Sequence, residues 1–391
     1  MNILRISLCF LLMGFGTLMN AQEKKNEKPE LSIGGALRFN YNLSSWKEGQ
    51  KKRGGDFGFD VFRLNAKAKY KGIKLNAEYR LYSEGFGGGM LKQGWLGYDF
   101  NKNDNLQIGL TQVPFGVSLY NSHSFFFSIN YYVGLEDDHD MGIKYTHKGK
   151  KWEYAIAFFK NAEELEFGNN SDISGSRYSY DVSSIDLNGN GELVLRNKEI
   201  NQLNGKVNYL FGNDKISHKL GTSFEYGGLY NLDTEEIGSH YALAVHYELK
   251  AGKFDLKAQM SKYKYDAKNP VGQAGKLIAM TAFGAPYLTD SEAITYTLGA
   301  AYSIPIKCGP ISKLQVYNDF GYMDKATNGF EDSLMNVTGV LITSGNVYTY
   351  VDFAAGKNQP WLGSVWTNAL ASGTPDADWE TRFNINIGYY F

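Results

Sequence analysis

The chain has 391 residues, in which 40 lysines and arginines stand against 41 aspartates and glutamates, so the formal net charge is −1. This balance gives no reason to expect a nucleic-acid partner, and 2 cysteines are too few for a disulfide framework or a thiolate metal cluster. Aromatic residues make up 15% of the chain, beside 44 glycines and only 8 prolines, and this mixture favours β-sheets with one wet and one apolar face.

The N-terminus has the features of a secretory signal peptide. Arg5 supplies its positive charge, residues 6–19 form an apolar run, and Ala21 offers a cleavage point. We therefore expect residues 1–21 to be removed and residues 22–30, "QEKKNEKPE", to form a short charged tail in the periplasm. No other segment reaches the roughly 18 apolar residues that a transmembrane helix needs.

From residue 31 onward, apolar residues occupy every second position in segments of about ten residues, the length of a tilted transmembrane strand. In the first segment, 31–41, Leu31, Ile33 and Leu37 share one face while Arg38 lies on the other. The same period recurs in the segments 62–70, 73–83, 94–100, 105–113, 141–147, 151–159, 202–211, 219–226, 241–250, 253–263, 293–304, 313–323, 335–343, 347–354 and 379–391. We therefore predict about sixteen strands.

The connections between these segments alternate in length. Short turns, such as Lys71 with Gly72, follow the even-numbered segments. Long connections follow the odd-numbered segments and cover 42–56, 84–90, 114–138, 161–198, 227–238, 266–291, 323–334 and 356–378. Because every backbone group must be paired in hydrocarbon, a spanning sheet has to close on itself. The pattern predicts an all-β fold, a transmembrane antiparallel β-barrel over residues 31–391 with short periplasmic turns and long extracellular loops.

The polar positions of the first three segments are mostly basic. The side chains expected to face the lumen there are Arg38, Arg63, Lys67, Lys69, Lys74 and Arg80, against Glu78 alone. The remaining segments carry acidic and basic side chains in similar numbers. One wall of the channel is therefore predicted to be basic, and a basic lining favours anions.

The turn at Lys71 and Gly72 predicts how these charges face one another. A two-residue hairpin loop there sets Lys69 opposite Lys74 and Arg63 opposite Arg80. Like charges in this position need an anion or a carboxylate to offset them. Closure of the barrel is expected to bring Arg382 to the same wall near Arg38. The alternative is an ordinary lumen in which loop carboxylates pair with the basic side chains, the candidates being Glu136, Asp137 and Asp138.

The long connection 114–138 is aromatic and mostly uncharged until its end. Outside the barrel it would expose an apolar patch. We expect it to fold inward and constrict the pore, with Pro114, Phe115 and Gly116 making a sharp exit from the preceding strand. The alternative is an outward loop that meets a partner or a neighbouring protomer.

Three stretches, "FRLNAKAKY", "GWLGYDF" and above all "LQIGLTQVPFGV", resemble the phosphate-selective porin O and P family of Gram-negative outer membranes. The resemblance covers about residues 57–147. It implies a sixteen-stranded trimeric porin that passes small anions, with phosphate bound by lumen arginines and lysines in some members. In barrels of this kind, a terminal aromatic residue, here Phe391, resembles the signal read by the barrel assembly machinery.

Other motifs carry weaker signals. Residues 186–197 match a calcium-binding loop except at position twelve, where Asn197 replaces the bidentate glutamate, so no metal or other cofactor is expected. A hydrolase using Ser122, His123 and Ser124 is less favoured, because residues adjacent in sequence rarely point at one another. A barrel acting as an adhesin or receptor through its long loops is a further alternative.

Together these features predict a non-enzymatic porin of a Gram-negative outer membrane. We expect passive diffusion of small hydrophilic solutes with a bias to anions, including phosphate. The expected partners are these solutes, outer-membrane lipid, the assembly machinery and two further copies of the chain in a homotrimer.

Overall fold

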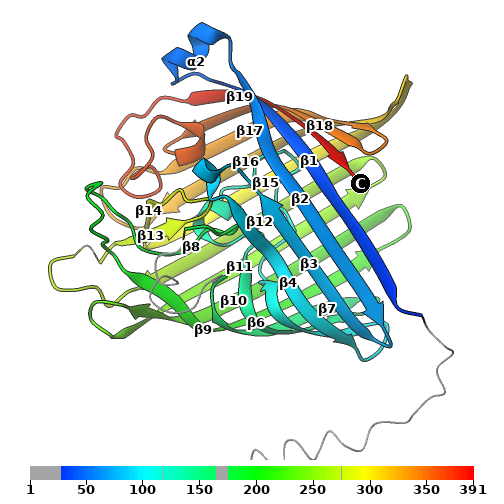
Figure 1. Cartoon of the computed structure of the whole chain (residues 1–391), viewed down its shortest axis with the longest axis horizontal. Coiled ribbons are helices and arrows are strands. Elements are labelled where there is room, and N and C mark those ends of the chain that lie inside the picture. The colour runs from blue at the N-terminus through cyan, green and yellow to red at the C-terminus, as the bar shows by residue number, and fades with distance from the viewer. Residues whose placement is uncertain (1–27, 118, 164–174, 274) are drawn as a thin grey trace, which may run out of the picture.

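The computed structural model describes residues 28–117, 119–163, 175–273 and 275–391. Sixteen of its strands form one closed antiparallel barrel (Figure 1), which confirms the predicted fold class. The expected signal peptide, 1–21, and most of the expected tail, 22–30, lie outside the described residues. No helix in the described part of the chain is long and apolar enough to cross a membrane.

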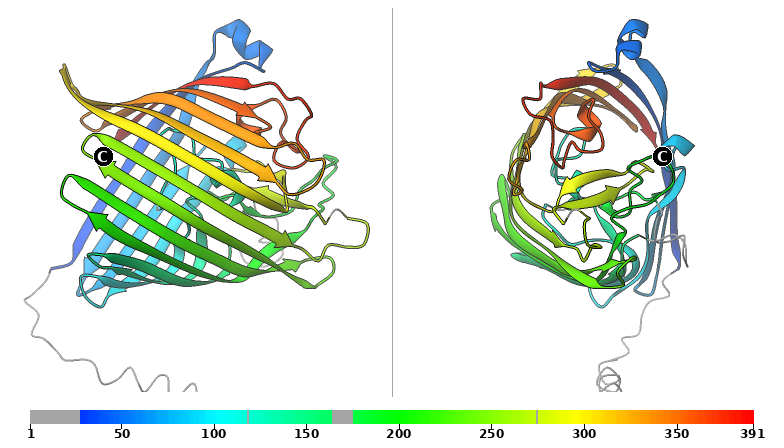
Figure 2. Two further views of the ribbon diagram at one scale, coloured as in Figure 1. Left: turned by 180° about the vertical axis from the view of Figure 1, so that it is seen from behind. Right: turned by 90° about the vertical axis from the view of Figure 1, so that its left-hand side faces the viewer.

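Each predicted segment corresponds to one barrel strand, and several strands extend beyond the predicted ends. In chain order the barrel strands are β1 (Glu30–Ser44), β2 (Asp56–Tyr70), β3 (Ile73–Leu81), β4 (Gly89–Asp99), β5 (Asp104–Gln112), β6 (His139–Lys148), β7 (Trp152–Asn161), β9 (Asn197–Gly212), β10 (Ile216–Asn231), β11 (Ile237–Ala251), β12 (Phe254–Asp266), β15 (Glu292–Cys308), β16 (Ile311–Lys325), β17 (Ser333–Ser344), β18 (Val347–Lys357) and β19 (Glu380–Tyr390). The long and short connections lie at opposite ends of the barrel (Figure 2).

The register of the β2–β3 hairpin agrees with the prediction. Lys71 and Gly72 both have positive φ, 48° and 85°, as a two-residue type I′ turn requires. Across the ladder, Lys69 faces Lys74 and Arg63 faces Arg80. Like charges therefore face each other twice on this wall.

The register of the closing strands corrects one prediction. β1 pairs with β19 as expected, but Arg38 faces Gly388 while Arg382 faces Ser44. A strand rises about 3.3 Å per residue, so Arg382 lies roughly 20 Å along the wall from Arg38. It stacks instead on Trp46, with its guanidinium carbon 5.2 Å from a ring centroid.

The outer surface of the barrel is apolar. Large side chains point outward from strands all round the wall, among them Leu37, Leu64, Tyr79, Ile108, Ile156, Leu243, Leu298, Phe320 and Tyr389, each at least 37% exposed. Positions between them on the same strands are buried or polar. This is the pattern expected of a surface in contact with lipid.

The long connections contain structure that the sequence analysis missed. Residues of 161–198 and 266–291 form a three-stranded sheet of β8 (Asp181–Val182), β13 (Leu277–Thr281) and β14 (Tyr287–Asp290), in the order β14-β13-β8. The right-hand view of Figure 2 places β13 and β14 within the ring of the barrel. These connections therefore do not all extend outward as loops.

A hydrophobic core fills the lumen where this inner sheet meets the wall. Its largest buried side chains include Tyr131, Tyr178, Tyr180, Tyr287, Phe159 and Tyr263. Phe159 and Tyr263 come from wall strands and the other four from the long connections. In this half of the barrel the inward positions are therefore partly apolar, whereas alternation alone had predicted a water-filled interior throughout.

The helix α2 (Glu48–Arg53), by contrast, projects beyond the barrel (Figure 1).

Candidate functional site: the lumen wall and the third long connection

The basic wall is formed by β1 to β4, and one carboxylate sits between its two facing arginines. The Glu78 Oε1 atom lies 2.6 Å from Arg80 Nη2 and 3.8 Å from Arg63 Nη1. Arg80 is buried, and it also donates to the Tyr82 hydroxyl at 3.1 Å. The side chain of Arg63 remains 21% exposed. The two arginines thus differ in access to solvent.

Two further basic side chains of this wall have acidic partners. Arg38 Nε lies 2.9 Å from Asp60, and Lys74 Nζ lies 2.7 Å from Asp99. Asp60 faces the lumen because the β1–β2 register shifts at Arg38, and a shift of one residue changes which face a side chain occupies. The predicted segment began after Asp60, so the sequence analysis missed this partner.

Lys67 and Lys69 are the accessible charges of the wall. Both are exposed, and no carboxylate of the described residues lies within ion-pair distance of either. They line a hollow of about 370 Å³ together with Ser32, Lys74, Trp95 and Glu30, which faces Lys69 across the β1–β2 ladder. This hollow lies near the β2–β3 turn, away from the packed loops.

A basic residue that the sequence analysis missed, Lys92 on β4, lies among aromatic rings. Its ammonium and the Arg80 guanidinium each lie 4.4 Å from the centroid of Tyr178. Lys92 also donates to Asp137 at 2.6 Å, and the Tyr178 hydroxyl donates to the same carboxylate at 2.9 Å. The β3–β4 register shifts at Glu78, so simple alternation could not place Lys92 on the lumen face.

The third long connection, predicted over 114–138, contacts the opposite part of the wall. The backbone N–H of Gly116 donates to Ser223 Oγ at 2.9 Å, and that of Val117 donates to Gln259 Oε1 at 2.7 Å. Gly116 has a φ of 53° and an added Cβ would meet Gln259, so glycine is required where the chain turns. Its neighbours Pro114 and Phe115 are buried.

His123 holds the middle of this connection against two strands. Its Nδ1 lies 3.0 Å from Asp319 on β16, and its Nε2 lies 3.2 Å from Asp255 on β12. Burial alone would lower the pKa of His123, but hydrogen bonds to the two carboxylates outweigh burial and raise the pKa above its ordinary value. The protonated ring can therefore bridge both carboxylates.

The three carboxylates expected to pair with the basic wall have different partners. Only Asp137 contacts a basic side chain, Lys92, which was not among the predicted residues. Glu136 accepts hydrogen bonds from the Ser128 hydroxyl and from the Asn121 backbone N–H, and burial raises its pKa to about 7. Asp138 lies among other buried acids.

The weaker sequence signals also have structural explanations. The hydroxyls of Ser122 and Ser124 both donate to the Phe126 carbonyl, whereas His123 contacts carboxylates, so these residues are not arranged as a nucleophile and its base. Asp186 accepts the backbone N–H groups of three residues in an exposed turn, Asn188, Gly189 and Gly191. Its carboxylate therefore closes the turn.

Comparison with solved structures identifies the fold. An anion-selective porin from Comamonas acidovorans is 14% identical over 93% of this chain and 100% of that one, with a TM-score of 0.58. The outer membrane channel DcaP of Acinetobacter baumannii is 13% identical over 95% and 100%, with a TM-score of 0.58. The trimer form of OmpT, an outer membrane protein of Vibrio cholerae, is 14% identical over 93% and 100%, with a TM-score of 0.56.

This chain therefore has the fold of outer-membrane porins and channels. Neither a protein-family model nor a curated protein sequence matches it. Membership of the phosphate-selective porin O and P family remains a prediction from the resembling stretches.

Proposed function

We propose that the protein is an outer-membrane porin through which small hydrophilic solutes diffuse passively. The closed barrel with an apolar outer surface supports a position in a membrane, because closure leaves no unpaired strand edge. Its structural neighbours include a porin and a channel by name. The proposed location is the outer membrane of a Gram-negative bacterium, reached after loss of residues 1–21.

The proposed selectivity is a bias to anions, and the observation that carries it is a pair of exposed lysines that form no ion pair with a carboxylate of the described residues. Lys67 and Lys69 present two ammonium groups on one wall, next to Lys74. Arg63 adds a partly exposed guanidinium further along β2. Ammonium and guanidinium donors suit oxyanions, so phosphate is the solute we propose to test first.

The third long connection is proposed to set the width of the pore. It crosses from β5 to contacts with β10, β12 and β16, so it occupies part of the lumen. The Tyr178 cluster, defined by Arg80, Lys92, Asp137 and Tyr178, ties its end to the basic wall. A solute would pass between this connection and the remaining polar wall.

The proposed assembly is a homotrimer inserted by the barrel assembly machinery. One structural neighbour, OmpT of Vibrio cholerae, is described as a trimer. Phe391 ends the chain directly after β19, and its backbone exchanges hydrogen bonds of 2.9 and 3.1 Å with Gly35. A terminal residue fixed in this way extends the closing ladder by one pair.

A receptor or adhesin is the second candidate, and the hydrophobic core within the barrel is the observation that favours it. Buried tyrosines of three long connections pack against wall residues inside the barrel, so apolar side chains occupy part of the lumen. The projecting helix α2 would then be part of a contact surface. On this account the barrel would carry no solute.

A liposome swelling assay separates the two candidates. Vesicles containing the folded protein are placed in isotonic solutions of small sugars and of phosphate salts. The porin proposal predicts swelling rates that fall with solute size and exceed those of protein-free vesicles. A rate equal to that of protein-free vesicles for every solute would favour the receptor.

A further inference from the structure

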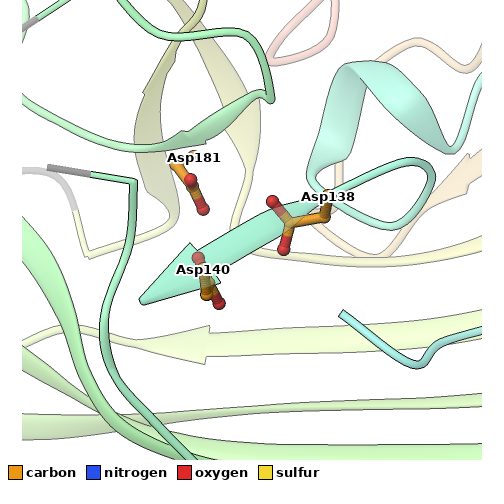
Figure 3. Close-up of side chains that lie close together, drawn as sticks. All are labelled: Asp138, Asp140 and Asp181. Carbon is orange, nitrogen blue, oxygen red and sulfur yellow. The ribbon is translucent and has the colours of Figure 1, made fainter. Parts of the chain in front are cut away.

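Three buried aspartates converge where the third long connection, the inner sheet and the barrel wall meet. Asp138 ends the connection, Asp140 belongs to β6 and Asp181 belongs to β8. One carboxylate oxygen from each lies within 4.8 Å of the others, and Figure 3 shows the three side chains facing one another. Their exposed fractions are 6%, 1% and 2%. Segments some 40 residues apart in sequence thus bring acidic groups together in the buried interior.

Several buried oxygens at this position lack a hydrogen-bond donor. Among the described residues, neither Asp140 Oδ1 nor Asp181 Oδ2 has a hydrogen-bond partner. Gln202 on β9 donates its amide N–H to the other oxygen of Asp140 at 3.2 Å, and its own Oε1 is also unpartnered. The hydroxyl of Thr111, which faces Asp140 across the β5–β6 ladder, has no partner either. Buried acceptors without donors are costly, and a cation would satisfy them.

In the described part of the chain, acidic side chains outnumber basic ones around these aspartates. Three more buried carboxylates lie close enough to repel them, those of Glu163, Glu199 and Glu225. The basic groups facing the cluster are Arg177, whose Nη1 is 3.9 Å from Asp181, and His240, which is 3.5 Å from Glu225. Among the described residues, six carboxylates face these two groups, so the cluster needs protons or a bound cation to avoid uncompensated charge in a region of low dielectric constant.

We propose that Asp138, Asp140 and Asp181 bind a calcium ion. Ca²⁺ takes six to eight oxygen ligands in flexible geometry, whereas Mg²⁺ requires a near-ideal octahedron and retains water. Here the oxygens come from carboxylates on different elements. Gln202 now turns its amide nitrogen to Asp140, and a half-turn of this amide would bring in its oxygen as a neutral ligand. This arrangement and the burial favour calcium. The site is separate from residues 186–197, where the sequence pattern had suggested a calcium loop.

The ion would connect three parts of the molecule. Asp181 lies on β8, which pairs with β13 of the next inward connection, so a contact at Asp181 extends to the whole inner sheet. Asp138 and Asp140 join that contact to the third connection and to β6. Calcium would therefore hold the inward connections against the wall. This inference does not depend on whether the barrel conducts.

Calcium titration of the full chain, folded in detergent and freed of metal with EDTA, tests the proposal. Isothermal titration calorimetry with CaCl₂ should show about one ion per chain, and thermal unfolding should occur at higher temperature with calcium than with EDTA. The double variant Asp140→Asn with Asp181→Asn should lose both effects. Asp186→Asn is the matched control, because it removes a carboxylate of the exposed turn, and it should retain both.

A milder variant keeps the test informative if the double variant does not fold. Gln202→Met removes the neutral oxygen and should weaken calcium binding by about tenfold. The proposal is overturned if the wild-type chain gives no binding heat and the same unfolding temperature in calcium and EDTA. It is equally overturned if the double variant still binds calcium, or if binding is lost in Asp186→Asn. A wild-type chain that binds no calcium, beside a double variant that is more stable in both solutions, would also overturn the proposal, because protons would then balance the cluster.

Discussion

Arg63 and Arg80 face each other across the β2–β3 ladder, and both lie within 4 Å of the Glu78 carboxylate. One carboxylate lies beside two guanidinium groups, so these three side chains together keep a net positive charge. Arg80 donates hydrogen bonds to Glu78 and Tyr82 inside the wall, whereas the side chain of Arg63 is partly exposed to the lumen. The two arginines therefore contribute differently: Arg80 mainly to structure and Arg63 mainly to the field in the channel.

Replacing Glu78 with glutamine should make the channel more anion-selective and the barrel less stable. Among the described residues, Glu78 is the carboxylate that pairs with both arginines. Leaving buried charge unpaired costs about 3 kcal/mol. Zero-current potential in a KCl gradient and unfolding in urea measure the two effects. Asp56→Asn, which removes a carboxylate paired with Arg53 near helix α2, is the control and should leave selectivity unchanged. Unchanged selectivity in Glu78→Gln would contradict this account of the wall.

Two substitutions of Tyr178 should separate the contribution of its ring to stability from that of its hydroxyl. Tyr178→Phe loses only the hydrogen bond to Asp137, which is worth about 1 kcal/mol, and keeps a ring beside Arg80 and Lys92. Tyr178→Ala also loses the buried ring and should destabilise the barrel by about 3 to 5 kcal/mol. Urea unfolding measures the free energy that each variant loses, and the loss should be larger for Tyr178→Ala. Equal losses would mean that the ring does not contribute through packing and cation contacts.

The attachment of the third connection should weaken as pH rises through the raised pKa of His123. The charged ring is favoured in the folded state, so its contribution is fully present below about pH 6.5 and is lost progressively as pH rises through the raised pKa. The groups facing the ring are Asp255 and Asp319, which favour its charge, and Lys257, which opposes it. Hydrogen bonds to charged groups contribute about 1.5 to 3 kcal/mol.

A comparison of pH profiles isolates this histidine from other titrating groups. Thermal unfolding of the wild-type chain and of His123→Gln is measured from pH 5 to pH 9. The wild-type advantage should be largest at low pH and small at high pH. An advantage that stays constant, or grows as pH rises, would exclude the protonated bridge.

Deleting Phe391 should impair insertion more than conduction. The deletion removes the two backbone hydrogen bonds to Gly35 and the terminal aromatic group proposed as the assembly signal. The folded fraction in outer membranes and the single-channel conductance of inserted protein are measured separately. A folded fraction equal to that of the full chain, or an altered conductance in the inserted molecules, would contradict the prediction.

The barrel could be predicted because each strand carries its own signal. The period of two fixed the outward and inward faces, and the turn at Lys71 and Gly72 fixed the register that sets Arg63 opposite Arg80. The closing register could not be fixed in the same way. β1 and β19 are joined by no turn, so nothing local aligned Arg382 with Ser44.

The site was predicted less completely, for two physical reasons. Shifts of register at Arg38 and at Glu78 place Asp60 and Lys92 in the lumen, where strict alternation would not put them. Short strands such as β8 have too few residues to show a period. Tyr178 and Asp181 therefore looked like parts of an ordinary loop, although tertiary contacts bury both of them.

The most direct test of the central claim is the zero-current potential of single channels in a KCl gradient across a planar bilayer. The account predicts conducting channels with an anion-selective potential, and a smaller anion preference when Arg63 and Arg80 are both replaced with glutamine. Added phosphate should reduce the chloride current by competing for the basic wall. A cation-selective potential in the wild-type protein, or folded barrels that never conduct, would contradict the account.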